Sequence, residues 1–126
     1  MAHTVLIVDD YPDTLELLEL TLRLEGYGTI LASTGFDAVR LAQADHPDIV
    51  IMDIFLPQMD GIAASLAIKA TVGLEHVPII GYTARTGLPG NDTAVFDAVL
   101  PKPCSPDVLL GTLSKLLAGR RPVAAS

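Results

Sequence analysis

Short apolar runs alternate with longer amphipathic stretches along most of the chain. The runs are rich in β-branched residues, which predicts strands, and the longer stretches predict helices. This alternation is typical of βαβ units that build a parallel sheet. The runs at 5–8 and 49–52 are apolar at every position, as expected for strands that are covered on both faces. We therefore expect strands at 5–8, 28–31, 49–52, 77–82 and 98–100.

Helical periodicity and helix-end signals lie between these strands. Pro12 suits the first turn of a helix and Gly26 suits its stop, while leucines between them recur at helical spacing. Glycines and a proline within 86–93 favour turns, so a short helix at 91–96 is the most that we expect there. The other helices are expected at 12–25, 35–44, 61–72 and 106–117, the last with Ser105 as its N-cap.

The succession of βα units predicts an α/β fold with a doubly wound, five-stranded parallel sheet and helices on both faces. We expect the strand order 2-1-3-4-5 of flavodoxin-like folds, in which ligands bind at the carboxyl ends of the strands near the switch point between the first and third. The 126 residues suit one domain, which we assign to 1–118. Residues 119–126 lack periodicity and are expected to be a terminal tail or a truncated linker.

Composition narrows the classes of function. Half of the residues are apolar and 18% are charged, so a packed core is expected. The net charge of −7 disfavours direct binding to nucleic acid or to an anionic membrane, and no apolar run approaches the roughly 18 residues of a membrane helix. Cys104 is the single cysteine, which excludes an internal disulfide and, without a signal segment, favours a cytoplasmic protein. The histidines His3, His46 and His76 lie in separate segments and are interpreted as surface residues rather than ligands.

Carboxylate, hydroxyl and ammonium side chains gather where the expected strands end. Asp9 and Asp10 follow the first strand, Asp53 the third, Thr83 the fourth and Lys102 the fifth. Two unit charges about 4 Å apart repel by roughly 4 kcal/mol at an effective dielectric near 20, so three clustered carboxylates need protons or cations. An all-oxygen set favours a hard cation such as Mg²⁺, which commonly combines carboxylates with phosphate oxygens. The strand ends therefore predict a phosphoryl-transfer site in which one carboxylate is the candidate nucleophile.

These residues belong to motifs that carry a family resemblance. Asp9-Asp10, the run 53–61 (DIFLPQMDG), Thr83-Ala84 and Lys102-Pro103 together resemble the receiver domain of bacterial two-component response regulators. The resemblance covers about residues 4–118. Each motif alone is a weak signal, but their shared order, spacing and position at strand ends make the combination specific.

The resemblance implies a phosphoacceptor and a metal site. Asp53 would attack phosphorus and become phosphorylated. Asp10 and Asp53 would ligate Mg²⁺ or Mn²⁺ directly, the backbone carbonyl of Phe55 would complete the protein ligands, and Asp9 would act through bound water. The chain would then be a switch that catalyses only its own phosphorylation and dephosphorylation, rather than an enzyme acting on other substrates.

The same resemblance implies roles for the other strand-end residues. Lys102 would pair with one phosphoryl oxygen, while the Thr83 hydroxyl and the Ala84 amide would bond another. The Lys102–Pro103 peptide bond is expected to be cis. The phosphoryl donor would be a sensor histidine kinase or a histidine phosphotransfer protein. The output partner is unknown, and the sequence leaves open whether the chain forms a homodimer.

Three features depart from the family pattern. Val99 stands where the family usually has an aromatic residue that moves with the threonine, which puts that relay in doubt. The segment around the fourth helix is short and irregular. Phe55 and Arg85 occupy positions that, in the family that the chain resembles, influence how fast water reaches the phosphoryl group. We hypothesise that Phe55 shields the phosphorus and prolongs the phosphorylated state.

Three alternatives stay open at this point. A hydrolase of the aspartyl-nucleophile phosphatase type would usually carry an Asp-x-Asp motif after its first strand, and Asp9-Asp10-Tyr11 lacks that spacing. A flavin-binding relative would need a phosphate cradle rich in Ser, Thr and Gly, where this chain has two acidic residues. A scaffold receiver with impaired switching fits Val99 but not the intact set of strand-end residues.

Overall fold

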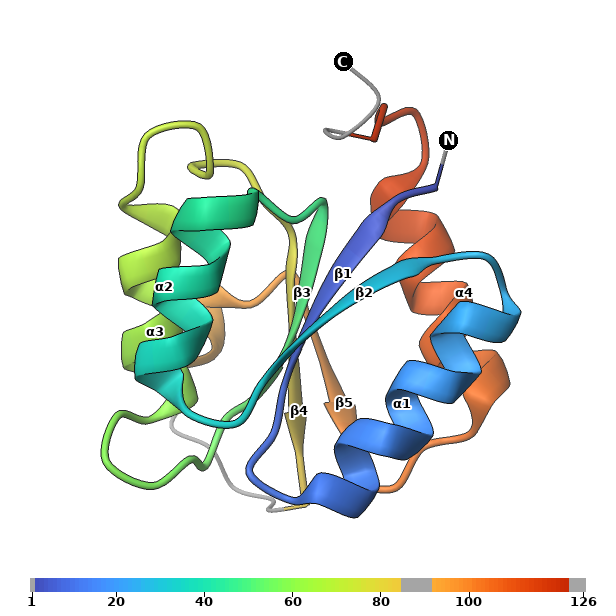
Figure 1. The fold of residues 1–126 in the computed structure, drawn as a ribbon, viewed down its shortest axis with the longest axis horizontal. Helices are drawn as coiled ribbons and strands as arrows, with labels where there is room; N and C mark the ends of the chain where they lie inside the picture. The colour runs from blue at the N-terminus through green and yellow to red at the C-terminus, as the bar shows by residue number, and fades with distance from the viewer. Residues whose placement is uncertain (1, 85–91, 123–126) are drawn as a thin grey trace.

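The computed structural model describes residues 2–84 and 92–122, and it confirms the expected five-stranded parallel sheet with the order β2-β1-β3-β4-β5 (Figure 1). The strands are β1 (Thr4–Val8), β2 (Gly28–Ala32), β3 (Ile49–Asp53), β4 (Ile79–Thr83) and β5 (Ala98–Pro101). The helices are α1 (Pro12–Leu24), α2 (Gly35–Asp45), α3 (Gly61–Lys69) and α4 (Pro106–Leu117), together with the 3₁₀ turn η1 (Asp92–Val95).

The sheet lies between two pairs of helices, α1 with α4 on one face and α2 with α3 on the other (Figure 1). Each face has its own apolar core, because successive side chains of a strand point to opposite faces. In β1, Leu6 and Val8 pack in the cluster with α2 and α3, while Val5 and Ile7 pack in the cluster with α1 and α4. Because helices cover both faces of the sheet, the sequence of the central strands is continuously apolar.

Local signals in the sequence set the helix ends. The side chains of Thr34, Asp60 and Ser105 accept hydrogen bonds from backbone N–H groups in the first turns of α2, α3 and α4, at 3.0, 2.8 and 3.3 Å. Pro12 begins α1, and Gly26 follows its end with a φ of +93°, as expected for a helix stop. Among the residues that the structure describes, no helix combines the length and the apolar character needed to cross a bilayer.

At 91–96, where a short helix is the most that we expect, the described residues form the short 3₁₀ turn η1, and residue 91 lies outside them. Two other elements differ in their bounds from those expected. The third helix ends at Lys69 rather than at residue 72, because the Thr71 amide bonds back to the carbonyl of Ile68 in a tighter turn. β4 begins at Ile79, two residues later than expected, since Val77 and Pro78 precede its pairing with β3.

Gly61 begins α3 directly against the last residues of β3. A Cβ at this position would lie 2.2 Å from the carbonyl oxygen of Asp53 and 2.8 Å from the Cα of Ile54. Both atoms belong to backbone that the sheet holds in place, so neither side of the contact has room to move. The absence of a side chain at Gly61 therefore lets the helix approach the strand that carries Asp53.

We predict that Gly61→Ala lowers the free energy of unfolding by roughly 3 kcal/mol, because the new methyl group must displace strand backbone. Gly111→Ala is the matched control: it lies within α4 and a Cβ there meets nothing within 4 Å. This control should raise the free energy of unfolding by about 0.5–1 kcal/mol through its higher helix propensity. Urea unfolding of both variants measures the difference, and equal effects of the two substitutions would contradict the prediction.

Candidate functional site

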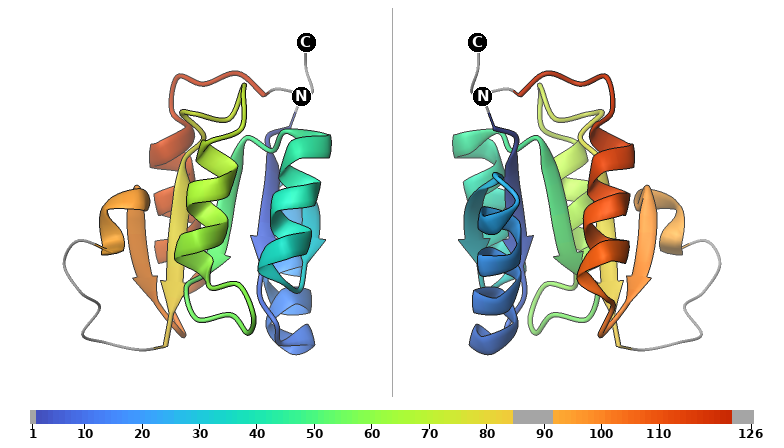
Figure 2. Two further views of the ribbon diagram at one scale, coloured as in Figure 1. Left: turned by 90° about the vertical axis from the view of Figure 1, so that its left-hand side faces the viewer. Right: turned by 90° about the vertical axis from the view of Figure 1, so that its right-hand side faces the viewer.

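The strand arrows all point to one edge of the sheet, so the carboxyl ends of the parallel strands meet there (Figure 2). The candidate residues come at or directly after these ends. Asp53 and Thr83 are the last residues of β3 and β4, while Asp9 and Lys102 come directly after β1 and β5. The strand register places Asp53 opposite Tyr82 on β4. Elements that are distant in sequence thus deliver their polar side chains to a single place.

Three carboxylates converge at this edge as the sequence predicts. One oxygen from each of Asp9, Asp10 and Asp53 lies within 4.8 Å of the other two. Asp9 and Asp53 are buried, with 1% and 5% of their surface exposed, whereas Asp10 is exposed. The cluster therefore has a closed inner side and an open outer side.

Lys102 joins two of these carboxylates. Its Nζ donates to Asp9 Oδ2 at 2.5 Å and to Asp53 Oδ2 at 3.1 Å. Its backbone N–H also donates to the carbonyl of Thr83 at 2.8 Å, which ties the chain after β5 to the end of β4. The expected cis bond between Lys102 and Pro103 is confirmed. The ammonium stands between β1 and β3, where it offsets part of the carboxylate charge.

Backbone amides orient the same two carboxylates from the opposite side. The N–H of Tyr11 donates to Asp9 Oδ1 at 2.9 Å, and the N–H of Phe55 donates to Asp53 Oδ1 at 3.1 Å. In each case the donor lies two residues beyond the aspartate, so the turn after the strand holds the carboxylate in one direction. Asp53 consequently presents Oδ2 to Lys102 and Oδ1 to the loop.

Burial dominates the electrostatics of the site. It raises the pKa of Asp53 above its ordinary value, the charge of Asp9 adds to this, and the hydrogen bond and charge of Lys102 partly oppose it. Burial alone would lower the pKa of Lys102, but the hydrogen bonds to Asp9 and Asp53 outweigh it, so this pKa is raised. Lys102 therefore stays charged at neutral pH. Its positive charge partly offsets the free-energy cost of burying an ionised Asp53.

An open cleft of about 610 Å³ lies beside the cluster. It gives Asp53 access to a substrate from one direction, and Phe55 forms part of its wall with 39% of its surface exposed. Asp9, with 1% of its surface exposed, is not among the residues that line it. The lining residues are Asp10, Tyr11, Thr14, Asp53, Phe55, Thr83, Ala84 and Lys102.

The donor set at this edge fits a hard divalent cation. Its candidate ligands are carboxylate oxygens, and the three carboxylates face one ammonium among the contacts described for this cluster. Two negative charges therefore remain uncompensated by that ammonium. Mg²⁺ prefers such oxygen ligands and tolerates an open site in which water completes its coordination.

Other positions that the sequence singled out lie as follows. Val99 is on β5 with 39% of its surface exposed, and Arg85 lies outside the described residues. Phe96 packs against β4 at Gly81, where a Cβ would lie 3.0 Å from its ring. Cys104 is partly buried against the core cluster shared by α1 and α4. The relay that the family builds on an aromatic residue thus has valine at its usual position and a buried phenylalanine nearby.

The sequence interpretation did not predict Tyr11 and Thr14, which line the cleft, or Tyr82, whose ring contacts Lys102. The Nζ of Lys102 lies 5.3 Å from the centroid of the Tyr82 ring. An aromatic residue directly before Thr83 is visible in the sequence, but its place beneath the lysine depends on the register of three strands. The available signal was the alternation of side chains along the strand, which places Tyr82 on the opposite face of the sheet from Thr83.

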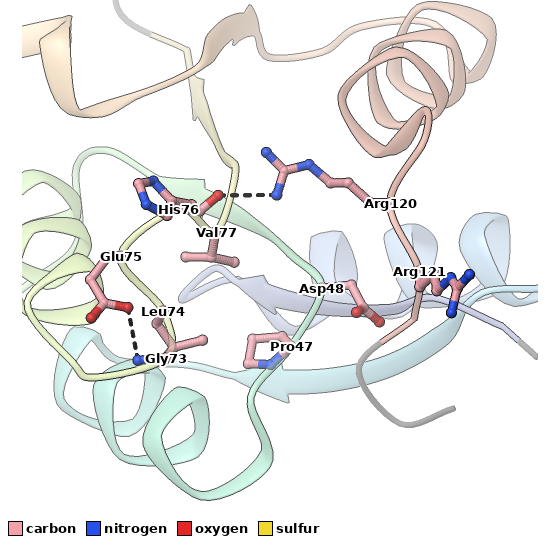
Figure 3. Close-up of a pocket in the computed structure, with 9 residues that line it drawn as sticks. All are labelled: Pro47, Asp48, Gly73, Leu74, Glu75, His76, Val77, Arg120 and Arg121. Atoms are coloured by element: carbon pink, nitrogen blue, oxygen red, sulfur yellow. Dashed lines mark hydrogen bonds between the residues drawn. The ribbon is translucent and has the colours of Figure 1, made fainter. Parts of the chain in front are cut away.

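A second, smaller hollow of about 150 Å³ lies at the opposite edge of the sheet (Figure 3). There Arg120 Nη1 donates to the carbonyl of His76 at 3.2 Å. His76 is exposed, while His3 and His46 are partly exposed. None of the three belongs to the carboxylate cluster found among the described residues.

Comparison with known proteins identifies the relatives of this chain. The family model for the response regulator receiver domain matches residues 5–114. The polar-differentiation response regulator DivK of Brucella ovis is 31% identical over 121 residues, which cover 93% of this chain and 98% of that protein.

Two solved structures share the fold over nearly their whole length. The chemotaxis protein CheY4 of Vibrio cholerae superposes with a TM-score of 0.87 and 30% identity, covering 93% of this chain and 100% of that one. The receiver domain of a sensor histidine kinase from Pseudomonas aeruginosa superposes with a TM-score of 0.85 and 31% identity, covering 94% and 100%. The latter structure holds a magnesium ion coordinated in its active site cleft.

We predict that Asp53→Asn raises the urea midpoint of unfolding at pH 7 in EDTA. Because the pKa of Asp53 is raised on folding, the folded state favours the protonated form, and the ionised carboxylate costs stability at neutral pH. This cost disappears as pH falls through the folded pKa, so the advantage of Asn should shrink in acid. Asp45→Asn, at an exposed position, is the control and should change stability by less than about 0.5 kcal/mol. A lower midpoint for Asp53→Asn at pH 7 would contradict the electrostatic account.

Proposed function

Since the chain belongs to the family of response regulator receiver domains, which act in phosphorelay signalling, we propose that it accepts a phosphoryl group on Asp53. The position of Asp53 carries the proposal. Its carboxylate ends a buried strand, lines the open cleft and is bonded to Lys102. Among the three clustered carboxylates, Asp9 does not line the cleft and Asp10 is exposed, so Asp53 alone combines a fixed orientation with access from the cleft.

The transfer has a simple balance. One carboxylate oxygen of Asp53 donates an electron pair to the phosphorus of a phosphohistidine, and the P–N bond breaks with its electrons passing to the imidazole. The imidazole nitrogen takes up a proton, and Asp53 becomes an acyl phosphate. In the second half of the cycle, water attacks the phosphorus and the bond between phosphorus and the Asp53 oxygen breaks with its electrons returning to the carboxylate. Inorganic phosphate leaves, and the attacking water gives up a proton to the phosphate or to solvent. Alignment and charge neutralisation carry most of such a reaction.

Positive charge and hydrogen-bond donors of the chain suit the incoming phosphoryl oxygens. Lys102 already lies at 3.1 Å from Asp53 and would move to a phosphoryl oxygen once the acyl phosphate forms. Thr83 and Ala84 line the cleft on the side of β4, where the threonine hydroxyl and the alanine amide would bond a second oxygen. These donors come from the ends of rigid strands, which limits their reorganisation during transfer.

The carboxylate cluster would hold the divalent cation on which this chemistry depends. Asp10, Asp53 and the carbonyl of Phe55 would be direct ligands, and Asp9, engaged by Lys102, would act through water. When bound, Mg²⁺ or Mn²⁺ would supply positive charge to the phosphoryl oxygens. The partial compensation of the cluster by one lysine supports this assignment.

Receiver domains interact with histidine kinases and with output partners, and we propose that the donor here is a sensor histidine kinase or a histidine phosphotransfer protein. The chain would catalyse only its own phosphorylation and dephosphorylation. The free thiol of Cys104 supports a cytoplasmic location, since unpaired cysteines are usual in reducing compartments.

We predict that incubation with acetyl phosphate and Mg²⁺ adds one phosphoryl group to the chain, read by intact mass. Asp53→Asn should gain none, because amide nitrogen and oxygen cannot form the acyl phosphate. EDTA should reduce the gain by at least tenfold if the carboxylate cluster depends on a divalent ion.

The matched control is Asp45→Asn, which leaves the cleft intact and should gain one group at the wild-type rate. Phosphorylation of Asp53→Asn at an unchanged rate would show that another residue is the phosphoacceptor. Release of phosphate from an aromatic phosphate ester well beyond one equivalent would instead favour a hydrolase.

We also propose that Phe55 slows the return to the unphosphorylated state by shielding the phosphorus from water. Its ring forms part of the cleft that contains Asp53. Phe55→Asn should therefore accelerate dephosphorylation by severalfold, roughly 3- to 10-fold, because a polar side chain there admits and orients water. Phe36→Asn, an exposed phenylalanine that does not line the cleft, should leave the rate unchanged. The decay of the phosphorylated mass with time measures both, and equal rates for Phe55→Asn and wild type would refute the shielding role.

A further inference from the structure

Lys102 has to cross a whole strand to reach Asp53. The register pairs Asp53 of β3 with Tyr82 of β4, and Tyr82 with Leu100 of β5. Paired residues of a parallel sheet share a face, so these three side chains stand side by side. Lys102 follows β5 and reaches an aspartate on β3, two strand spacings or roughly 10 Å away. The residue on the strand between them is Tyr82.

Tyr82 provides the surface over which the lysine passes. It is 7% exposed and packs in the core cluster between the sheet and helices α1 and α4. The Nζ of Lys102 lies 5.3 Å from the ring centroid, within the range in which a ring face attracts a cation. The same ammonium donates to Asp9 and Asp53. Lys102 is thus held by two carboxylates and one ring.

The phenol of Tyr82 lies near the thiol of Cys104, which follows Lys102 by two residues. Burial, with a further contribution from Cys104, raises the pKa of Tyr82, so the phenol is neutral at neutral pH. An ordinary core residue at this position would need neither a polar end nor a ring face directed at the lysine.

We propose that Tyr82 is a positioning residue for Lys102, whose ring supports the ammonium on its path from β5 to the phosphoacceptor. The inference rests on the proposed function of Asp53. A ring at this position attracts the cation without neutralising it, so the lysine remains available to a phosphoryl oxygen. A third carboxylate in its place would compete with the phosphoryl group for the same charge. Tyr82 therefore restricts the position of the Lys102 ammonium. It does not neutralise the ammonium, whose charge stays available to the phosphoryl group.

The test compares a variant that keeps the ring with one that removes it. Tyr82→Phe should be phosphorylated by acetyl phosphate and Mg²⁺ within about twofold of the wild-type rate, because the ring face remains. Tyr82→Leu fills the core but offers no ring, and it should be slowed about 3- to 30-fold, the range that a cation–ring contact supports. A wild-type rate for Tyr82→Leu would overturn the inference and leave the role of Asp53 intact.

A double-mutant cycle separates positioning from structural damage. In a Lys102→Ala background, Tyr82→Leu should change the rate by less than about twofold, because the residue through which the ring acts is gone. Equal slowing in both backgrounds would overturn the inference. Ile80→Val, at a fully buried position earlier on β4, is the matched control for altered core packing and should leave the rate unchanged.

A measurement on the unmodified protein covers the case in which Tyr82→Leu does not fold. The Hε protons of Lys102 lie near the ring face and should show an upfield ring-current shift in NMR spectra of lysine-labelled protein, assigned through Lys102→Arg. Tyr82→Phe should retain this shift. Random-coil shifts for these protons in wild type would overturn the inference. Failure of wild type to gain any phosphoryl group would instead overturn the proposed function, together with the role assigned to Tyr82 in it.

Discussion

The mutual repulsion of three aspartates, offset by one lysine, is the constraint around which this protein is arranged. Asp9 and Asp53 are buried at strand ends where their charges cost stability, and Lys102 bonds both. Breaking either bond would leave a carboxylate in a poorly solvated place, which is expensive for a buried charge. The parallel sheet and its two apolar cores supply the stability that keeps such a cluster together. The residual negative charge would attract a divalent cation, whose positive charge would in turn offset that of the phosphoryl oxygens.

The scaffold accommodates this cluster through close approaches at the ends of its strands. Gly61 lets α3 begin against the carbonyl of Asp53, and the amide of Phe55 holds the carboxylate of the same residue. Each contact lies within a few residues of the strand end. A change in the local backbone would therefore also change the position of the Asp53 carboxylate. Thr83 is similarly tied through its carbonyl to the amide of Lys102. The edge of the sheet therefore acts as one connected unit rather than as separate loops.

Much of the fold and of the site could be predicted from the sequence, and the reasons are local. Alternating apolar runs and helical stretches define βα units, and parallel strands bring their carboxyl ends to one edge, so Asp10, Asp53 and Lys102 were found together. The 3₁₀ form of the short helix at Asp92–Val95 and the early end of α3 were not predicted, because tight turns depend on packing that the residues alone do not specify. The place of Tyr82 beneath Lys102 was also missed. It follows from the register of β3, β4 and β5, which no local pattern encodes.

The bond between Lys102 and Asp9 joins residues that are 93 positions apart in the chain. During synthesis, the aspartates leave the ribosome long before the lysine that offsets them. A nascent chain that ends before β5 therefore carries the acidic cluster without its ammonium, and contacts of such high sequence separation form late. The charge of the site is balanced only when the last βα unit docks. An incomplete chain, even one with its first strands paired, therefore lacks the ammonium that bonds Asp9 and Asp53 in the finished molecule.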